Sequence, residues 1–158
     1  LSSSADGNLK VWDLLAHSCI HTTRPHADSV LCSVVDWSTG LLLSGGADCT
    51  LRLRHVSPQG RCMSRLSGHI SSVSCIAVDA ASQQALSGGS DKSLIQWDLR
   101  SGELVQRLVG HTDSVRCVSA EPGLQRALSG SFDHTLRLWD IDRGASTEVL
   151  SGHSKWVC

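Results

Sequence analysis

The chain has 158 residues, of which 41% are hydrophobic and 18% are charged, and its formal net charge is −1. This composition allows a packed core, and it excludes the strongly basic surface expected of a nucleic-acid-binding or lipid-binding protein. The apolar runs are only a few residues long, whereas a membrane helix needs about 20. We therefore expect neither nucleic acid nor a membrane as a partner.

The cysteines argue for reduced thiols. Seven cysteines are an odd number for a disulfide framework, and there is no CxxC pair of the kind found in zinc ribbons or redox motifs. An intracellular protein, in the cytoplasm or the nucleus, is the simpler interpretation. The chain starts at Leu1 and not at methionine, so we expect it to be a fragment of a longer protein.

Two sequence landmarks recur in register. The first reads SSSADGNLKVWD from Ser2, SGGADCTLRLRH from Ser44, SGGSDKSLIQWD from Ser87 and SGSFDHTLRLWD from Ser129, at steps of 42, 43 and 42 residues. The second reads PHADSVLC from Pro25, GHISSVSC from Gly68, GHTDSVRC from Gly110 and GHSKWVC from Gly152. Two landmarks with the same step indicate tandem structural units, and a period of about 40–45 residues is typical of propeller blades.

Each complete unit reads as four short strands. A β-rich or small-apolar run (30–37, 73–79 and 115–120) comes first, and LLLSGG, QALSGG or RALSGS follows it. A tight turn with a central aspartate leads to an alternating run such as TLRLWD, and then to a last run such as ELVQRLVG. Four strands spaced by about 10 residues fit an antiparallel meander. No segment keeps a helical period.

The spacing of GH, the SGS.D segment and WD resembles the WD-repeat family of β-propellers, and the resemblance covers essentially the whole chain. It implies an all-β fold, an incomplete β-propeller of four-stranded antiparallel blades. We expect whole blades at 27–66, 70–109 and 112–150, a partial blade at 1–24 and the start of another at 152–158. A blade needs neighbours on both faces, so both ends should expose apolar faces and strand edges, and the isolated fragment should be poorly soluble or associate.

The resemblance also implies a structural tetrad of histidine, serine, aspartate and tryptophan in each blade. We expect two complete tetrads, His69, Ser87, Asp91 and Trp97, and His111, Ser129, Asp133 and Trp139. Two more are incomplete, one with His26, Ser44 and Asp48 and the other with Ser2, Asp6 and Trp12. The same residue types make a hydrolytic triad, but a triad copied once per repeat is better explained as a brace of paired buried polar groups.

The second unit departs from the pattern. Arg54 stands where tryptophan is expected, His55 replaces the following aspartate, and Pro25 replaces the glycine before His26. The guanidinium could pair with Asp48, or its stem could cover the blade edge while its head reaches water. In either case we expect this blade to be less rigid than the two that follow.

Several residues suggest other chemistry. Cys32, Cys75 and Cys117 share one register, and we interpret them as small buried thiols, because successive sheets lie too far apart for a disulfide or a shared metal ion. No metal or cofactor is expected. Cys49, in a turn expected to be exposed, is a candidate for modification. Lys10, Arg52 and Arg137 alternate with apolar residues, as charges in solvent or covering an edge would.

Positions that vary between repeats are the candidates for partner contact, because function on a propeller concentrates in its loops. Four of them stand in the turns expected to share one face: Leu31, Arg116, Phe132 and Trp156. The aromatic and arginine members have the chemistry of interface hot spots. Packing between blades is the competing explanation for each.

The predicted function is a non-catalytic platform, an adaptor or scaffold that binds other proteins or peptides, with no small-molecule substrate. One alternative is a propeller module attached to a catalytic domain elsewhere in the protein. A less favoured alternative is a hydrolase that uses His111, Ser129 and Asp133. Fold alone does not choose among the processes that such platforms serve.

Overall fold

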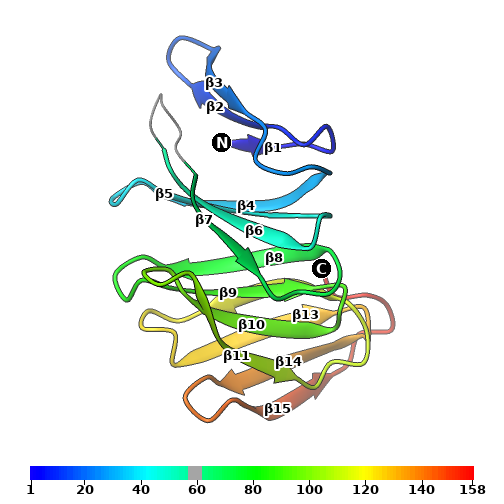
Figure 1. Cartoon of the computed structure of the whole chain (residues 1–158). Coiled ribbons are helices and arrows are strands. Elements are labelled where there is room, and N and C mark those ends of the chain that lie inside the picture. Colours follow the sequence, from blue (N-terminus) through cyan, green and yellow to red (C-terminus); the bar gives the residue numbers. More distant parts are fainter. Residues whose placement is uncertain (57–61) are drawn as a thin grey trace.

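The computed structural model describes residues 1–56 and 62–158, in which 15 strands and no helix are found (Figure 1). The first sheet holds three strands: β1 (Ser2–Ser3), β2 (Leu9–Asp13) and β3 (Ser18–Thr23). The second holds β4 (Val30–Asp36), β5 (Leu41–Gly46), β6 (Thr50–His55) and β7 (Cys62–Ser67). The third holds β8 (Val73–Asp79), β9 (Gln84–Gly89), β10 (Ser93–Asp98) and β11 (Glu103–Val109). The fourth holds β12 (Val115–Ala120), β13 (Arg126–Ser131), β14 (Thr135–Asp140) and β15 (Ala145–Ser151).

Each sheet is an antiparallel meander in which every strand pairs with the next one along the chain. Figure 1 shows the sheets stacked in chain order, from the blue sheet β1–β3 to the orange and red end of β12–β15. The prediction of an all-β fold, an incomplete propeller of four-stranded antiparallel blades, is confirmed, so the sheets are called blades below.

The second strand of each blade packs closely against the first strand of the next blade. A side chain at Gly45 would place its Cβ 2.6 Å from Val73 Cγ1, and Gly88 stands in the same relation to Val115. Gly130 repeats the contact, because its Cβ would lie 2.7 Å from Val157 Cγ1. Val157 also donates its backbone N–H to Ser131 O at 3.0 Å. The C-terminal residues thus lie against β13 as β8 lies against β5.

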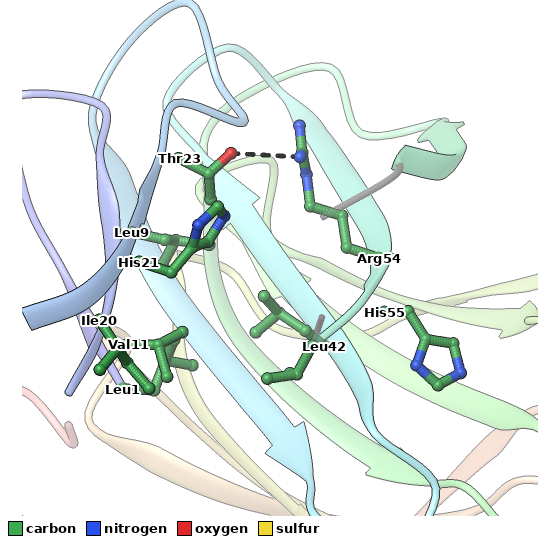
Figure 2. Close-up of a pocket in the computed structure, with 10 residues that line it drawn as sticks. Leu1, Leu9, Val11, Ile20, His21, Thr23, Leu42, Arg54 and His55 are labelled. Carbon is green, nitrogen blue, oxygen red and sulfur yellow. Dashed lines mark hydrogen bonds between the residues drawn. The ribbon is translucent and has the colours of Figure 1, made fainter. Parts of the chain in front are cut away.

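The core lies in the seams between blades. Trp97 packs against leucines of β5, β6 and β7, and Trp139 packs against leucines of β9, β10 and β11. Each tryptophan therefore fills the seam to the preceding blade. The first seam is different, because Arg54 replaces the tryptophan there and a cavity lies beside it (Figure 2).

The faces at the two ends of the stack are exposed, as expected. Leu86 is fully buried, whereas Leu128 at the same register of β13 is 37% exposed. Trp12 is 41% exposed, whereas Trp97 is fully buried. The difference follows from position, because within the described chain no sheet covers the outer faces of the first and last blades.

Candidate functional site

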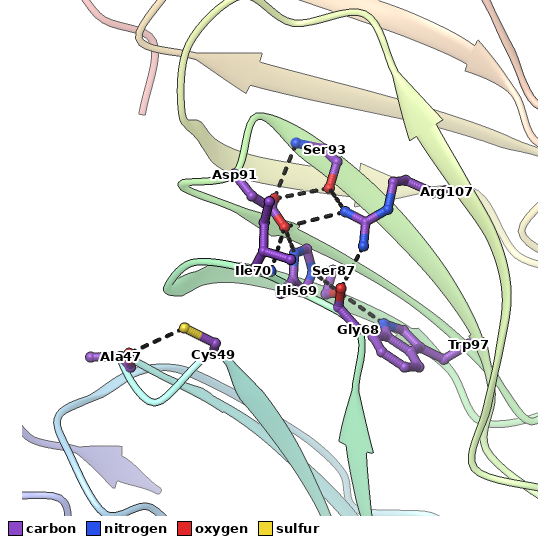
Figure 3. A network of polar contacts seen from close by, with 10 residues as sticks. All are labelled: Ala47, Cys49, Gly68, His69, Ile70, Ser87, Asp91, Ser93, Trp97 and Arg107. Carbon is purple, nitrogen blue, oxygen red and sulfur yellow. Dashed lines mark hydrogen bonds and ion pairs between the residues drawn. The ribbon is translucent and has the colours of Figure 1, made fainter.

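In the third blade the four residues predicted as a tetrad form one hydrogen-bonded chain (Figure 3). Trp97 Nε1 donates to Ser87 Oγ at 2.8 Å, and Ser87 Oγ lies 2.7 Å from His69 Nε2. The opposite ring nitrogen, His69 Nδ1, lies 2.8 Å from Asp91 Oδ2. The chain crosses the blade from β10 through β9 to the turn that precedes β8, so it ties three elements together.

The fourth blade repeats this geometry almost atom for atom. Trp139 Nε1 donates to Ser129 Oγ at 2.8 Å, Ser129 Oγ lies 2.8 Å from His111 Nε2, and His111 Nδ1 lies 2.7 Å from Asp133 Oδ2. Burial lowers the pKa of His111, and the nearby Arg137 guanidinium lowers it further, against the opposing influence of Asp133. A neutral imidazole that donates from Nδ1 to a carboxylate must accept at Nε2, so the serine hydroxyl donates to the ring.

The aspartates also hold their own turns. Burial raises the pKa of Asp133, but hydrogen bonds from Thr135, His111 and backbone amides outweigh it and hold this pKa well below its usual value. Asp133 Oδ1 accepts from Thr135 N at 3.0 Å, and Oδ2 accepts from Thr112 N at 3.0 Å. One carboxylate therefore joins the turn before β12 to the turn before β14.

The incomplete tetrads keep only part of the chain. In the second blade, His26 Nε2 lies 2.9 Å from Ser44 Oγ and His26 Nδ1 lies 2.9 Å from Asp48 Oδ1. Arg54 reaches the preceding blade instead, where its Nη1 donates to Thr23 Oγ1 at 3.2 Å (Figure 2).

In the first blade, Trp12 Nε1 donates to Ser2 Oγ at 2.9 Å. Asp6 accepts from the backbone of Asn8 at 2.9 Å, in the turn between β1 and β2. The tryptophan–serine half and the aspartate turn are therefore both present. In the other blades the histidine stands 18 residues before the serine, and for Ser2 that position falls ahead of Leu1.

Sequence reasoning missed Arg107 on β11. Its Nη1 lies 3.3 Å from Asp91 Oδ2 and donates to Ser93 Oγ at 2.6 Å, while its Nη2 donates to the carbonyl of Gly68 (Figure 3). The alignment of the repeats could have pointed to Arg107. Ile95 occupies the third-strand position that Arg52 and Arg137 hold in their blades, and it pairs with Arg107 on the next strand. In the second blade both positions of this pair are basic, Arg52 and Arg65, whereas the third blade keeps only the arginine on the fourth strand, which still reaches Asp91.

Three of the four candidate contact residues form one stack. The rings of Phe132 and Trp156 lie 4.4 Å apart between centroids at an interplanar angle of 24°. The Arg116 guanidinium carbon lies 4.9 Å from the centroid of Phe132, and its Nη1 lies 3.4 Å from Ser74 Oγ. Trp156 is 65% exposed and Arg116 is exposed, while Phe132 is half-buried between them.

Leu31, the fourth candidate, lies outside this stack. It is 44% exposed on β4, two blades before the strand that carries Arg116. Leu31 was grouped with the other three because it holds an equivalent position in its repeat. The stack, however, consists of side chains that touch one another, and Leu31 is not among them. Leu31 is an isolated exposed side chain, which is common on protein surfaces.

The cysteines in the repeated register are buried or half-buried thiols. Burial raises the pKa of Cys32 to about 12, and it also raises the pKa of Cys75. Cys49 is half-buried and not exposed, and its Sγ lies 3.7 Å from Ala47 O (Figure 3).

Among residues 1–56 and 62–158, no group of three or more His, Cys, Asp or Glu side chains is arranged to hold a metal ion. The same residues include no helix with the length and apolar character of a membrane span.

The geometry of the tetrads resembles a hydrolytic triad but differs in access. Ser87 and Ser129 are buried, and each serine oxygen also accepts a hydrogen bond from an indole N–H. A substrate carbonyl would have to displace both the indole and the adjoining blade to reach this oxygen. The stack of Phe132, Trp156 and Arg116, in contrast, is open to solvent.

Comparison with known proteins identifies the family of this chain. The family model described as "WD domain, G-beta repeat" matches residues 17–54, 60–98 and 102–140, well over half of the chain. A nuclear distribution protein, PAC1-2 of Uncinocarpus reesii, is 37% identical over 57 residues. That match covers 36% of this chain and 12% of the relative.

Proposed function

The chain belongs to the WD-repeat family, and from this premise we propose that it serves as a non-catalytic platform, an adaptor or scaffold that binds other proteins or peptides. WD repeats in general support a role in protein interaction. The finer assignment, a platform whose contact surface is the stack of Arg116, Phe132 and Trp156, is carried by the exposure and geometry of that stack.

The stack has the composition and the order of an interface hot spot. Tryptophan and arginine dominate such spots, and a half-buried phenylalanine between them holds both side chains in place before a partner arrives. The backbone N–H of Phe132 donates to Ser114 O at 3.0 Å, so the turn that carries the ring is tied to the turn before β12 of the same blade. A partner would therefore meet side chains that are already ordered.

The tetrads support the structural side of the proposal. Their serine oxygens are buried and shared between an imidazole and an indole, which suits a brace and not a nucleophile. The same chain occurs in two blades, and repetition is expected of a structural element. We propose the tetrads as braces that keep the loops in position.

An intracellular setting is part of the proposal. The seven cysteines are free, and those on the first strands are at least half-buried among other blades. Free thiols are usual where glutathione keeps them reduced. The similarity to a nuclear distribution protein agrees with a place inside the cell.

The test compares partner binding by the full-length protein with that of variants on the stack. Partners would be captured from cells and quantified by mass spectrometry for the unchanged protein, for Trp156→Ala and for Arg116→Ser, which copies Ser74 of the preceding blade. We expect at least one specific partner to lose roughly thirtyfold in affinity, the equivalent of about 2 kcal/mol.

The matched control is Ser90→Ala, because Ser90 holds the register of Phe132 one blade earlier. It should leave the partners unchanged, and all variants should keep the thermal midpoint of the unchanged protein. Equal recovery of every partner by the stack variants would contradict the proposed surface. A hydrolytic turnover abolished by Ser129→Ala in a folded protein would contradict the non-catalytic assignment.

A further inference from the structure

The first seam between blades is filled differently from the other two. In the third blade, Trp97 on β10 lies opposite Ala85 on β9, and both side chains are fully buried. The fourth blade repeats this pair of a large and a small residue. At the same register of the second blade, Arg54 lies opposite Leu42. A leucine in place of alanine returns some of the volume that the missing indole leaves, but not all of it.

The remaining volume is a cavity of about 220 Å³ between the first two blades (Figure 2). Leu9, Val11 and Ile20 form the wall on the first blade, and Leu42 faces them from the second. Arg54 stands at the border of this apolar space, with its Nη1 donating to Thr23 Oγ1 across the seam at 3.2 Å. His21 and His55 line the cavity as well, so it is a mainly apolar space bordered by a guanidinium and two imidazoles.

The size and chemistry of the cavity select its ligand. An apolar cavity of about 150 Å³ is enough to bind benzene, so 220 Å³ admits a larger, fused ring. It is below the ~300 Å³ at which drug-sized sites begin, which favours a single ring system. A guanidinium at the wall attracts the face of an aromatic ring. The two other seams are filled at this register by an indole belonging to the chain itself.

We propose that the first seam binds a flat aromatic ring system of indole size that is supplied from outside this fold. The ring lies between Val11 and Leu42, with the Arg54 guanidinium against it. The site is separate from the stack of Arg116, Phe132 and Trp156, none of which lines the cavity. It does not depend on whether that stack binds a partner.

The experiment measures binding of two probes to the full-length protein by fluorine NMR. Fluoroindole represents a free aromatic molecule, and the amide of fluorinated N-acetyltryptophan represents an aromatic side chain on a polypeptide. The decisive variant is the double change Leu42→Ala with Arg54→Trp, which copies the pair found in the next two blades. It fills the cavity without the excess volume that Arg54→Trp alone would introduce beside Leu42.

We expect a saturable shift of the fluorine signal with the unchanged protein and none with the double variant. Binding of both probes assigns the site to a partner's side chain, and binding of fluoroindole alone assigns it to a free aromatic compound. Binding of neither probe, or binding that survives in the double variant, would overturn the proposal. If the double variant does not fold, Val11→Phe narrows the cavity from the other wall and must weaken binding in the same way.

Discussion

The two kinds of tetrad allow a matched test of what the serine does. Ser87 Oγ has two partners, His69 Nε2 and Trp97 Nε1, whereas Ser44 Oγ in the second blade is placed against His26 Nε2 with arginine at the tryptophan position. Both serines are fully buried. The change Ser87→Ala therefore orphans an imidazole and an indole, and Ser44→Ala orphans an imidazole.

The magnitude follows from the number of groups left without a partner. Each buried polar group that loses its hydrogen bond costs about 1–3 kcal/mol. Ser87→Ala should therefore lower the free energy of unfolding by about 2–6 kcal/mol, and Ser44→Ala by about 1–3 kcal/mol. The double change Ser87→Ala with Trp97→Phe removes the orphaned indole N–H, so it should cost less than the sum of the two single changes.

Urea denaturation of the full-length protein, followed by tryptophan fluorescence and circular dichroism, measures these differences. At a slope of about 1–3 kcal/mol per molar urea, the two serine variants should differ by roughly 1 M in their midpoints. Equal midpoints for Ser87→Ala and Ser44→Ala would refute the reasoning, because the indole would then gain nothing from the serine. Strict additivity of Ser87→Ala and Trp97→Phe would refute it as well.

Three further predictions concern the surroundings of the tetrads. Burial lowers the pKa values of His26 and His111 below 6.5 in the folded protein. As the pH falls below about 6.5, the unfolded chain therefore binds protons before the folded protein does, and the stability should decrease. A thermal midpoint that stays constant between neutral and mildly acid pH would contradict this. Arg107→Met should lower the free energy of unfolding by about 1–2 kcal/mol in the same urea titration, because its hydrogen bonds are lost. Arg100 is exposed, so Arg100→Met should leave the free energy of unfolding almost unchanged. Equal effects of the two changes would count against the role of Arg107. Cys49 has a φ of 63°, so Cys49→Gly should raise stability by about 1 kcal/mol in thermal denaturation, and a loss of stability would show that the thiol contact with Ala47 outweighs the backbone strain.

The strands and the tetrads were within reach of sequence reasoning because their signals are local and repeated. Alternation in runs such as TLRLWD predicts a strand directly. Recurrence at steps of 42 and 43 residues then aligns each histidine with its serine and aspartate. In the structure His69 lies within hydrogen-bond distance of both Ser87 and Asp91.

The candidate contact residues were harder to predict. Phe132, Arg116 and Trp156 were selected by residue type, and the same reasoning selected Leu31, which lies apart from them. Register shows which side chains lie at equivalent places, but not which ones touch. Contact between turns of neighbouring blades depends on the distance between the blades and on side-chain rotamers.

Sequence by itself determined the repeated unit and the order of strands in each blade, because both follow from periodicity along the chain, and the family resemblance predicted the members of the tetrads. Only the tertiary structure decided the contact of Arg107 with Asp91, the stack on Phe132 and the cavity beside Arg54. The physical reason is the same in all three cases. Volumes and charges are balanced across strands and seams, between residues that are distant in the sequence and become neighbours only when the blades pack.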